Sequence, residues 1–169
     1  GFSQKQDLLN KITEKLNELF PGAVEKTELA FDFPVFYINK DKIHEVLAYL
    51  KNDPEFNFHY LTDLTGIQTA DEKHLGVIYH LHNMPKNLRV RVKTFFQMTH
   101  PEIPTATDLW PAANWMERET YDFYGVKFKG HPNLKRILNV DEMDIFPLRK
   151  EYPLEDQSRE DKSDKMFGR

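Results

Sequence analysis

Residues 117–138 hold the densest group of side chains that could do chemistry, with the carboxylates Glu117, Glu119 and Asp122 around Arg118. Two carboxylates can act together as general acid and base. On a helix, however, positions two apart point about 200° apart, so Glu117 and Glu119 cannot face one substrate. Arg118 and Asp122 lie four apart and can form an ion pair. We therefore interpret this group as a structural cluster, not a catalytic pair, and expect Glu119 on the buried side of the helix.

Two glycines divide the loop that follows this helix. Gly125 is suited to the left-handed residue at a helix end. Gly130, His131 and Pro132 then form a rigid turn that projects an imidazole. A phosphate-binding loop would need more glycines and a helix starting directly after them. We interpret His131 as a hydrogen-bonded turn residue, with a ligand role as the minor alternative.

Two neighbouring strands carry a second polar pattern. His80 and His82 lie two apart on one strand and face the same side, a pair that could hold zinc, but a third ligand at a defined spacing is missing. On the next strand Arg89, Arg91 and Lys93 alternate with aliphatic residues. That alternation predicts a half-buried strand with a basic outer face, which is either a solvated face or an interface with an acidic partner.

The periodicity of apolar residues predicts the elements that position these groups. Helices are expected where apolar residues recur every three or four positions, and strands where they alternate or form aromatic and β-branched runs. The expected helices are 3–20, opened by a capping box at Ser3 and Gln6, then 41–52, and 111–124, capped by Thr107 or Asp108. The expected strands are 23–38, as one strand or two, 56–68, 74–82 and 88–97, with a hairpin at 83–87 and a loop over 100–111. This order indicates an α+β fold, a largely antiparallel sheet with helices packed on one face.

Composition limits the classes of function. The chain has 169 residues and a formal net charge of −4, which disfavours nucleic-acid binding. It has no cysteine, which removes disulfides, thiolate zinc sites, cysteine nucleophiles and cysteine-ligated iron–sulfur clusters. No apolar run approaches the roughly 20 residues that span a bilayer, so we expect no direct membrane insertion. Length and composition predict one α+β domain over 1–138 and a tail over 139–169.

The predicted tail has the character of a segment that orders against a partner. Residues 139–169 hold six lysines and arginines against nine aspartates and glutamates. Its apolar residues are spaced, and Pro147 and Pro153 favour extended backbone, whose polar groups need a partner surface. We expect Leu148, Arg149 and Tyr152 to make that contact.

The residues of 117–138 resemble the signature of the C subunit of proton-pumping NADH:quinone oxidoreductase, respiratory complex I. The matching positions share the order of acids, aromatics, Gly-His-Pro, basic and aliphatic residues, and they are Glu117, Arg118, Glu119, Asp122, Phe123, Tyr124, Gly130, His131, Pro132, Lys135, Ile137 and Leu138. Residues 79–81, 110–115 and 147–153 agree as well, whereas the N-terminal third is similar in layout only. The residues that we take as a partner-interface or structural signature are Glu117, Arg118, Glu119, Asp122, Gly125, Gly130, His131, Pro132, Arg136, Pro147, Leu148, Arg149 and Tyr152.

The resemblance implies a cofactor-free structural subunit of the peripheral arm, held at the cytoplasmic side of the inner membrane through its complex. It implies that iron–sulfur clusters, FMN and quinone are bound only by partner subunits. Those partners would be chiefly the D subunit, with the B and I subunits nearby. A subunit of a related membrane-bound hydrogenase or dehydrogenase assembly is the alternative. The remaining alternative is a small hydrolase that uses these carboxylates together with His131 or a metal ion.

Overall fold

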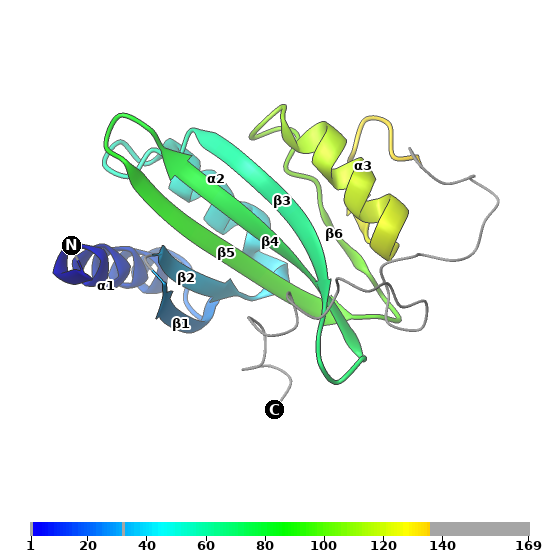
Figure 1. The fold of residues 1–169 in the computed structure, drawn as a ribbon, viewed down its shortest axis with the longest axis horizontal. Helices are drawn as coiled ribbons and strands as arrows, with labels where there is room; N and C mark the ends of the chain where they lie inside the picture. The colour runs from blue at the N-terminus through cyan, green and yellow to red at the C-terminus, as the bar shows by residue number, and fades with distance from the viewer. Residues whose placement is uncertain (1, 32, 136–169) are drawn as a thin grey trace.

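The computed structural model describes residues 2–31 and 33–135, with side chains from residue 4 onward. Three helices and seven strands alternate along this part of the chain (Figure 1). In order they are α1 (Phe2–Leu19), β1 (Val24–Ala30), β2 (Phe33–Ile38), the single 3-10 turn η1 (Lys40–Lys42), α2 (Ile43–Asn52), β3 (Tyr60–Gln68), β4 (His74–Asn83), β5 (Leu88–Gln97), β6 (Glu102–Pro104), α3 (Ala113–Tyr124) and β7 (Lys127–Lys129).

The main sheet has the strand order β1-β2-β5-β4-β3. All neighbouring pairs are antiparallel except β2 with β5, which run parallel, and the expected fold class is confirmed. The predicted hairpin joins β4 to β5, with Asn83 opposite Leu88 in the register. Residues 23–38 form two strands. The short strands β6 and β7 pair in parallel as a second, two-stranded sheet.

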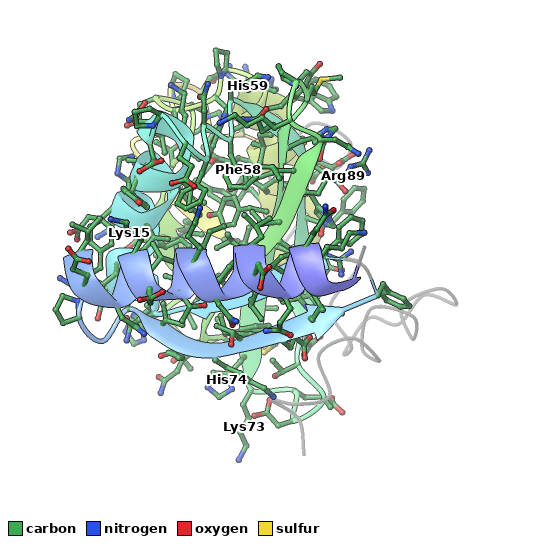
Figure 2. All side chains as sticks on the ribbon, turned by 90° about the vertical axis from the view of Figure 1, so that its left-hand side faces the viewer. Lys15, Phe58, His59, Lys73, His74 and Arg89 are labelled. Atoms are coloured by element: carbon green, nitrogen blue, oxygen red, sulfur yellow. The ribbon has the colours of Figure 1, made fainter. Side chains whose placement is uncertain are left out.

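One apolar core lies between the main sheet and the helices. Leu9 of α1, Val46 of α2 and Ala113 of α3 all belong to it, and Figure 1 shows α2 behind the long strands and α3 beside β3. Phe58, in the segment before β3, is fully buried, and Figure 2 shows its ring inside the molecule above α1. Burying a large aromatic or aliphatic side chain stabilises the fold by about 1.5–3 kcal/mol, so this face supplies most of the stability.

The opposite face of the sheet is aromatic and cationic. The rings of Tyr37 and Phe95 stack with centroids 6.3 Å apart, and the Lys93 ammonium lies 5.4 Å from the Tyr37 ring. Arg89 is exposed and Arg91 half-buried, but Lys93 is only 1 % exposed. Lys93 therefore departs from the other two basic residues of the predicted outer face, and the Tyr37 ring lies beside its ammonium group.

The start of α1 also departs from expectation. The helix begins at Phe2, so Ser3 lies inside it and is not the residue that precedes it. The apolar stripe of α1 is as predicted, with Leu9, Ile12 and Leu16 buried. None of the helices within residues 2–31 and 33–135 has both the length and the apolar character that a membrane crossing requires.

Candidate functional site

Helix α3 (Ala113–Tyr124) carries much of the signature, and Gly125 is the capping residue at its C-terminal end. Gly125 has φ 82°, the left-handed conformation that the sequence predicted, and its N–H donates to the carbonyl of Tyr121 at 2.9 Å. The expected N-terminal cap is wrong: the capping residue is Ala112, which makes no side-chain bond. Asp108 instead pairs with the imidazole of His44 at 2.8 Å, because residues 106–110 form a separate turn before the helix.

Glu117 is the carboxylate that points into the protein. It is fully buried and accepts hydrogen bonds from the Thr105 hydroxyl at 2.6 Å and from the Ala106 N–H at 2.7 Å. Burial raises the pKa of Glu117 to about 7, while these two hydrogen bonds act in the opposite direction. Glu119 is exposed, so its expected place on the buried side is wrong. Glu119 is two positions from Glu117 and therefore faces away from it, since each helical residue turns by about 100°.

The buried stripe of α3 is polar at its centre because of what it packs against. Ala113, Glu117 and Thr120 are buried at spacings of four and three, and this stripe meets the loop 105–107 and strand β3. On β3, Gly66 lies so close to Tyr124 that a Cβ atom there would stand 2.5 Å from the ring. The absence of a side chain at Gly66 thus sets how closely α3 approaches the sheet.

Tyr79 of β4 lies beneath the same stripe. Its side chain is fully buried, and its hydroxyl has no hydrogen-bond partner in the described part of the chain. Burial, and secondarily the charge of Glu117, raises the pKa of Tyr79 well above its usual value. A buried hydroxyl without a hydrogen-bond partner is unfavourable, because the hydrogen bonds that it makes to water in the unfolded chain are not replaced.

Arg118 does not form the expected ion pair. Within the described residues no ion pair joins Arg118 to Asp122; its guanidinium lies over the Trp115 ring, 5.4 Å from the centroid. Asp122 itself is fully buried. Residue spacing predicted that the two could meet, but the exposed indole of Trp115 draws the planar guanidinium toward the outside of the helix.

The loop after α3 is held by backbone and imidazole bonds. Strand β7 pairs with β6, and Gly130 then turns the chain with φ 85°. One ring nitrogen of His131, Nε2, lies 3.0 Å from the Asn114 carbonyl, and the other, Nδ1, accepts from the Asn133 N–H at 2.9 Å. The imidazole therefore connects the loop to the first turn of α3, with Nε2–H as the donor. Pro132 beside it is exposed.

The outer side of α3 and the exposed side of β3 form a shallow hollow of about 350 Å³. It is lined by Leu64 and Gly66 of the strand and by Glu119 and Phe123 of the helix. Trp115, one turn earlier on α3, is 54 % exposed. Exposed aromatic side chains beside one carboxylate are typical of a contact surface rather than of solvated helix.

The geometry does not support a hydrolytic site. Both carboxylate oxygens of Glu117 accept bonds from the loop 105–106, and the side chain is 0 % exposed, so a substrate cannot reach it. His80 and His82 share a face, but across the described ranges 2–31 and 33–135 no three His, Cys, Asp or Glu side chains gather to hold a metal ion. The described part of the signature connects α3 to the loop 105–107 and to the loop that follows the helix.

Sequence analysis missed the partners of Glu117. Thr105 and Ala106 lie 12 and 11 residues earlier in a segment expected to be loop, and strand β6, which leads into that segment, has three residues. The proline and threonine content of 100–111 was the only available signal. Five residues of the proposed signature, Arg136, Pro147, Leu148, Arg149 and Tyr152, lie outside the described residues, as does the predicted boundary at 138, and their roles stay predictions.

Comparison with known proteins gives consistent matches over most of the chain. Residues 36–158 match the family described as "Respiratory-chain NADH dehydrogenase, 30 Kd subunit". The C subunit of NADH-quinone oxidoreductase from Moorella thermoacetica is 39 % identical over 152 residues, 90 % of this chain and 100 % of that protein. The C subunit of the same enzyme from Citrifermentans bemidjiense is 41 % identical over 153 residues, 89 % of this chain and 93 % of that protein.

Two solved structures share the fold. A trypsin-resistant fragment (1–134) of Nqo5 superposes with a TM-score of 0.63 at 26 % identity, covering 76 % of this chain and 98 % of the fragment. A chain of the membrane-bound sulfane sulfur reductase, an archaeal respiratory membrane complex, gives a TM-score of 0.72 at 24 % identity, covering 98 % of this chain and 94 % of that one. At that identity the second likeness concerns the fold alone.

Proposed function

This chain belongs to the family of the 30 kDa subunit of respiratory-chain NADH dehydrogenase, and from that membership we propose that it is a structural subunit, the C subunit, in the peripheral arm of an NADH:quinone oxidoreductase. The observation that carries the proposal is the match of residues 36–158 together with relatives 39–41 % identical over almost their whole length. In this role the chain supports electron transfer from NADH to quinone by holding other subunits in place.

The chain is proposed to bind no redox cofactor of its own, and iron–sulfur clusters, FMN and quinone are assigned to partner subunits. The sequence supports this, because it offers no cysteine thiolate to iron. The test is iron and flavin analysis with an absorption spectrum, on the purified chain after anaerobic incubation with iron, sulfide and FMN. Iron or flavin retained in stoichiometric amount after gel filtration would contradict the assignment.

The proposed partners are chiefly the D subunit, with the B and I subunits nearby. The hollow between α3 and β3 supports a protein contact, since Glu119 and Phe123 line it and Trp115, one turn earlier on α3, is 54 % exposed. The second proposed contact is the tail over 139–169, through Pro147, Leu148, Arg149 and Tyr152.

Affinity purification from native membranes tests both the complex and the tail. The tagged wild-type chain should recover flavin- and iron-containing subunits at moderate salt. Triple alanine substitution of Leu148, Arg149 and Tyr152 should reduce that recovery at least about tenfold, because anchor residues carry most interface energy. The matched control replaces three polar tail residues, Gln157, Ser158 and Ser163, by alanine and should behave like wild type. If the wild-type chain recovers no flavin- or iron-containing subunits, the proposed function is contradicted. If both triple variants recover these subunits equally well, only the proposed tail contact is contradicted.

Attachment to the membrane is proposed to be peripheral, through the complex, on the cytoplasmic side. We expect alkaline carbonate to release the chain from inverted membrane vesicles. We also expect added protease to digest the chain in inverted vesicles but not in right-side-out vesicles. Protection in inverted vesicles would place the subunit on the other side.

A subunit of a related respiratory assembly is the second candidate. The observation that favours it is the shared fold with a chain of the sulfane sulfur reductase complex, at 98 % coverage of this chain. The subunits that co-purify separate the two candidates: an NADH-oxidising flavoprotein supports the first, and a hydrogenase-like or sulfur-reducing set without it supports the second.

A further inference from the structure

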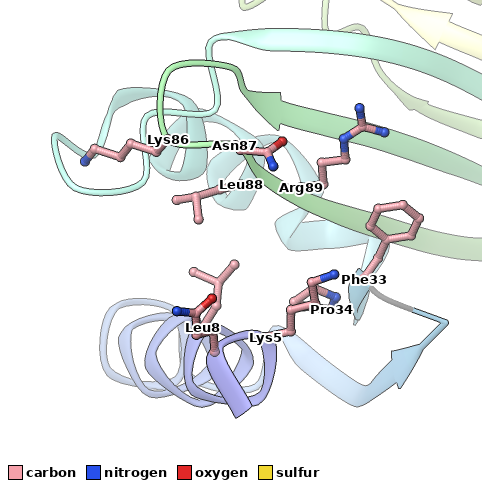
Figure 3. Close-up of a pocket in the computed structure, with 9 residues that line it drawn as sticks. Lys5, Leu8, Phe33, Pro34, Lys86, Asn87, Leu88 and Arg89 are labelled. Carbon is pink, nitrogen blue, oxygen red and sulfur yellow. The ribbon is translucent and has the colours of Figure 1, made fainter. Parts of the chain in front are cut away.

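A hollow of about 550 Å³ lies between the N-terminal part of α1 and the turn that joins β4 to β5, away from the signature. Figure 3 shows Leu8 of α1 facing Leu88 of β5 across this hollow, with Phe33 and Pro34 at the start of β2 on one side. These apolar side chains form its floor. Lys5, Lys86 and Arg89 also line the hollow and place cations at its rim.

The hollow continues onto the aromatic and cationic face of the sheet. A second, smaller depression of about 40 Å³ shares Phe33 and Arg89 with the first and adds His80 and Arg91. The Arg91 guanidinium lies 5.7 Å from the centroid of the Phe33 ring, and its Nε atom is buried without a hydrogen-bond partner among the described residues. We call the two depressions together the cationic groove.

The described lining of the cationic groove is rich in cations. No carboxylate occurs among the described residues that line either depression. Lys86 donates to the backbone carbonyl of Glu55 at 2.6 Å, and the carboxylates of Asp7 and Glu55 line a separate hollow on the other side of Lys86. Burial, and next the charge of Arg91, lowers the pKa of His80 to about 4, so the imidazole is neutral at physiological pH. Since the whole chain has a net charge of −4, this clustering of cations is local and not a consequence of composition.

We propose that the cationic groove is a docking site for an acidic, extended polypeptide segment of a neighbouring subunit. Arg89 and Arg91 lie two apart on β5, so their side chains leave the same face of the strand about 7 Å apart. An extended segment presents carboxylates at positions i and i+2 with the same spacing, and each can pair with one guanidinium in bidentate fashion. An apolar side chain of that segment fits between Leu8 and Leu88, on the floor of the larger depression.

The chemistry of the cationic groove favours a polypeptide over a nucleic acid. A phosphate backbone has no apolar group that could pack against the apolar floor of the groove. The net negative charge of the chain also opposes nonspecific binding to a nucleic acid. An acidic segment with one apolar residue meets both the rim and the floor. Charged pairs at such a rim set the rate and specificity of association, and the buried apolar contact adds affinity.

The first experiment is a titration that does not require the assembled complex. Full-length chain is titrated with a short acetylated peptide carrying Glu-Leu-Glu in a Ser/Gly background, with its Gln-Leu-Gln counterpart, and with an oligothymidine of similar length, followed by amide chemical shifts. Binding of the Glu-Leu-Glu peptide, with shifts at residues 86–91, is expected. Binding should weaken at least about tenfold in Arg89→Gln/Arg91→Gln and remain unchanged in the control Lys40→Gln/Lys73→Gln, whose two lysines are exposed elsewhere. Lys73 points away from the groove at the far end of the molecule (Figure 2).

Three results of this titration would overturn the proposal. They are no shift at millimolar peptide, equal binding of the Gln-Leu-Gln peptide, and stronger binding of oligothymidine, which would make the groove a polyanion site. Circular dichroism must first show the same melting temperature for both double variants. If Arg91, which is half-buried, cannot be replaced without unfolding, Lys86→Gln/Arg89→Gln is used instead, since both of these side chains are exposed.

The second experiment identifies the occupant in the complex and rests on the proposed function. A photo-reactive phenylalanine derivative replaces Phe33 in the full-length chain, membranes are irradiated, and the cross-linked peptide is sequenced by mass spectrometry. The expected product is a segment of another subunit with two carboxylates within about four residues. A cross-link to a neutral or basic segment, or to this chain itself, would overturn the proposal. A failed purification of any complex, with the peptide still bound in the titration, would instead count against the proposed function alone.

Discussion

The carboxylate of Glu117 on α3 accepts a hydrogen bond from the backbone N–H of Ala106 at 2.7 Å, at the centre of an otherwise apolar contact. The same carboxylate accepts from the Thr105 hydroxyl, so one side chain satisfies two donors of the segment after β6. The first turn of α3 is held in turn by the His131 imidazole, whose Nε2 lies 3.0 Å from the Asn114 carbonyl. The surface of α3 that carries Trp115 and Glu119 is thereby fixed in place by polar bonds on its buried side.

Replacing Glu117 by alanine should lower the free energy of unfolding by about 2–3 kcal/mol, because it strands the buried N–H of Ala106 and the hydroxyl of Thr105. Urea denaturation at pH 5, below the raised pKa of Glu117, measures the change by circular dichroism. Glu119→Ala is the matched control, an exposed carboxylate on the same helix, and should change stability by less than about 0.5 kcal/mol. Equal losses in the two variants would show that the Glu117 bonds contribute nothing specific.

The buried Glu117 and the half-buried His80 should give the pH dependence of stability opposite signs. The pKa of Glu117 is raised to about 7, so the folded state holds its proton longer than the unfolded state. Its contribution to stability is full below the ordinary glutamate pKa of about 4.5 and is lost as pH rises through 7, by about 3 kcal/mol in all. The pKa of His80 is lowered to about 4, so its contribution is full above about 6.5 and is lost as pH falls toward 4.

In the wild-type protein these two effects offset each other between about pH 4 and pH 7. Single substitutions should separate them. Glu117→Gln should leave a stability that rises with pH over this range, and His80→Asn should leave one that falls. Chemical denaturation at half-unit pH intervals measures both slopes. Parallel curves for wild type and Glu117→Gln would show that Glu117 titrates normally in the folded chain.

The long elements could be predicted from sequence because each repeats its pattern over several turns or strand pairs. Leu9, Ile12 and Leu16 reveal the buried side of α1, and the alternation at 88–92 reveals β5. The buried side of α3 could not be predicted in the same way. Its apolar residues Trp115 and Phe123 lie on the outer side of the helix, and the carboxylate of Glu117 lies on the buried side. A rule that places apolar residues inward therefore predicted Glu119, and not Glu117, as the buried glutamate.

The contacts between distant segments were also beyond sequence reasoning. Strands β6 and β7 have three residues each and pair across 25 positions, as Glu102 does with Lys127, too short for any periodicity. The stacking of Arg118 on Trp115 competes with an ion pair to Asp122, and residue spacing alone permits both contacts without deciding between them.

Gly66 should not tolerate a side chain. A Cβ atom there would stand 2.5 Å from the Tyr124 ring, so Gly66→Ala must push α3 away from β3 and should cost about 1–3 kcal/mol. The measurement is the urea denaturation midpoint of Gly66→Ala, of Tyr124→Ala and of the double variant, which together form a double-mutant cycle. In the Tyr124→Ala background the ring is gone, and Gly66→Ala should cost clearly less, with the 3.0 Å approach of its Cβ to Thr120 Cγ2 still present. A cost that persists in full without the ring would place the conflict elsewhere, for example in the strand backbone.

Tyr79→Phe should stabilise the protein. The Tyr79 hydroxyl is fully buried, and within the described residues it has no hydrogen-bond partner, although it lies close enough to Glu117 for that charge to raise its pKa. Removing an unpaired buried hydroxyl while keeping the ring should raise the free energy of unfolding by about 1 kcal/mol, because the cost of desolvating that group disappears. Tyr37→Phe is the control, since the Tyr37 hydroxyl donates to Glu28 at 3.2 Å and its loss should destabilise. A loss of stability in Tyr79→Phe would mean that the hydroxyl bonds to Glu117 directly or through water, and that the pair shares a proton.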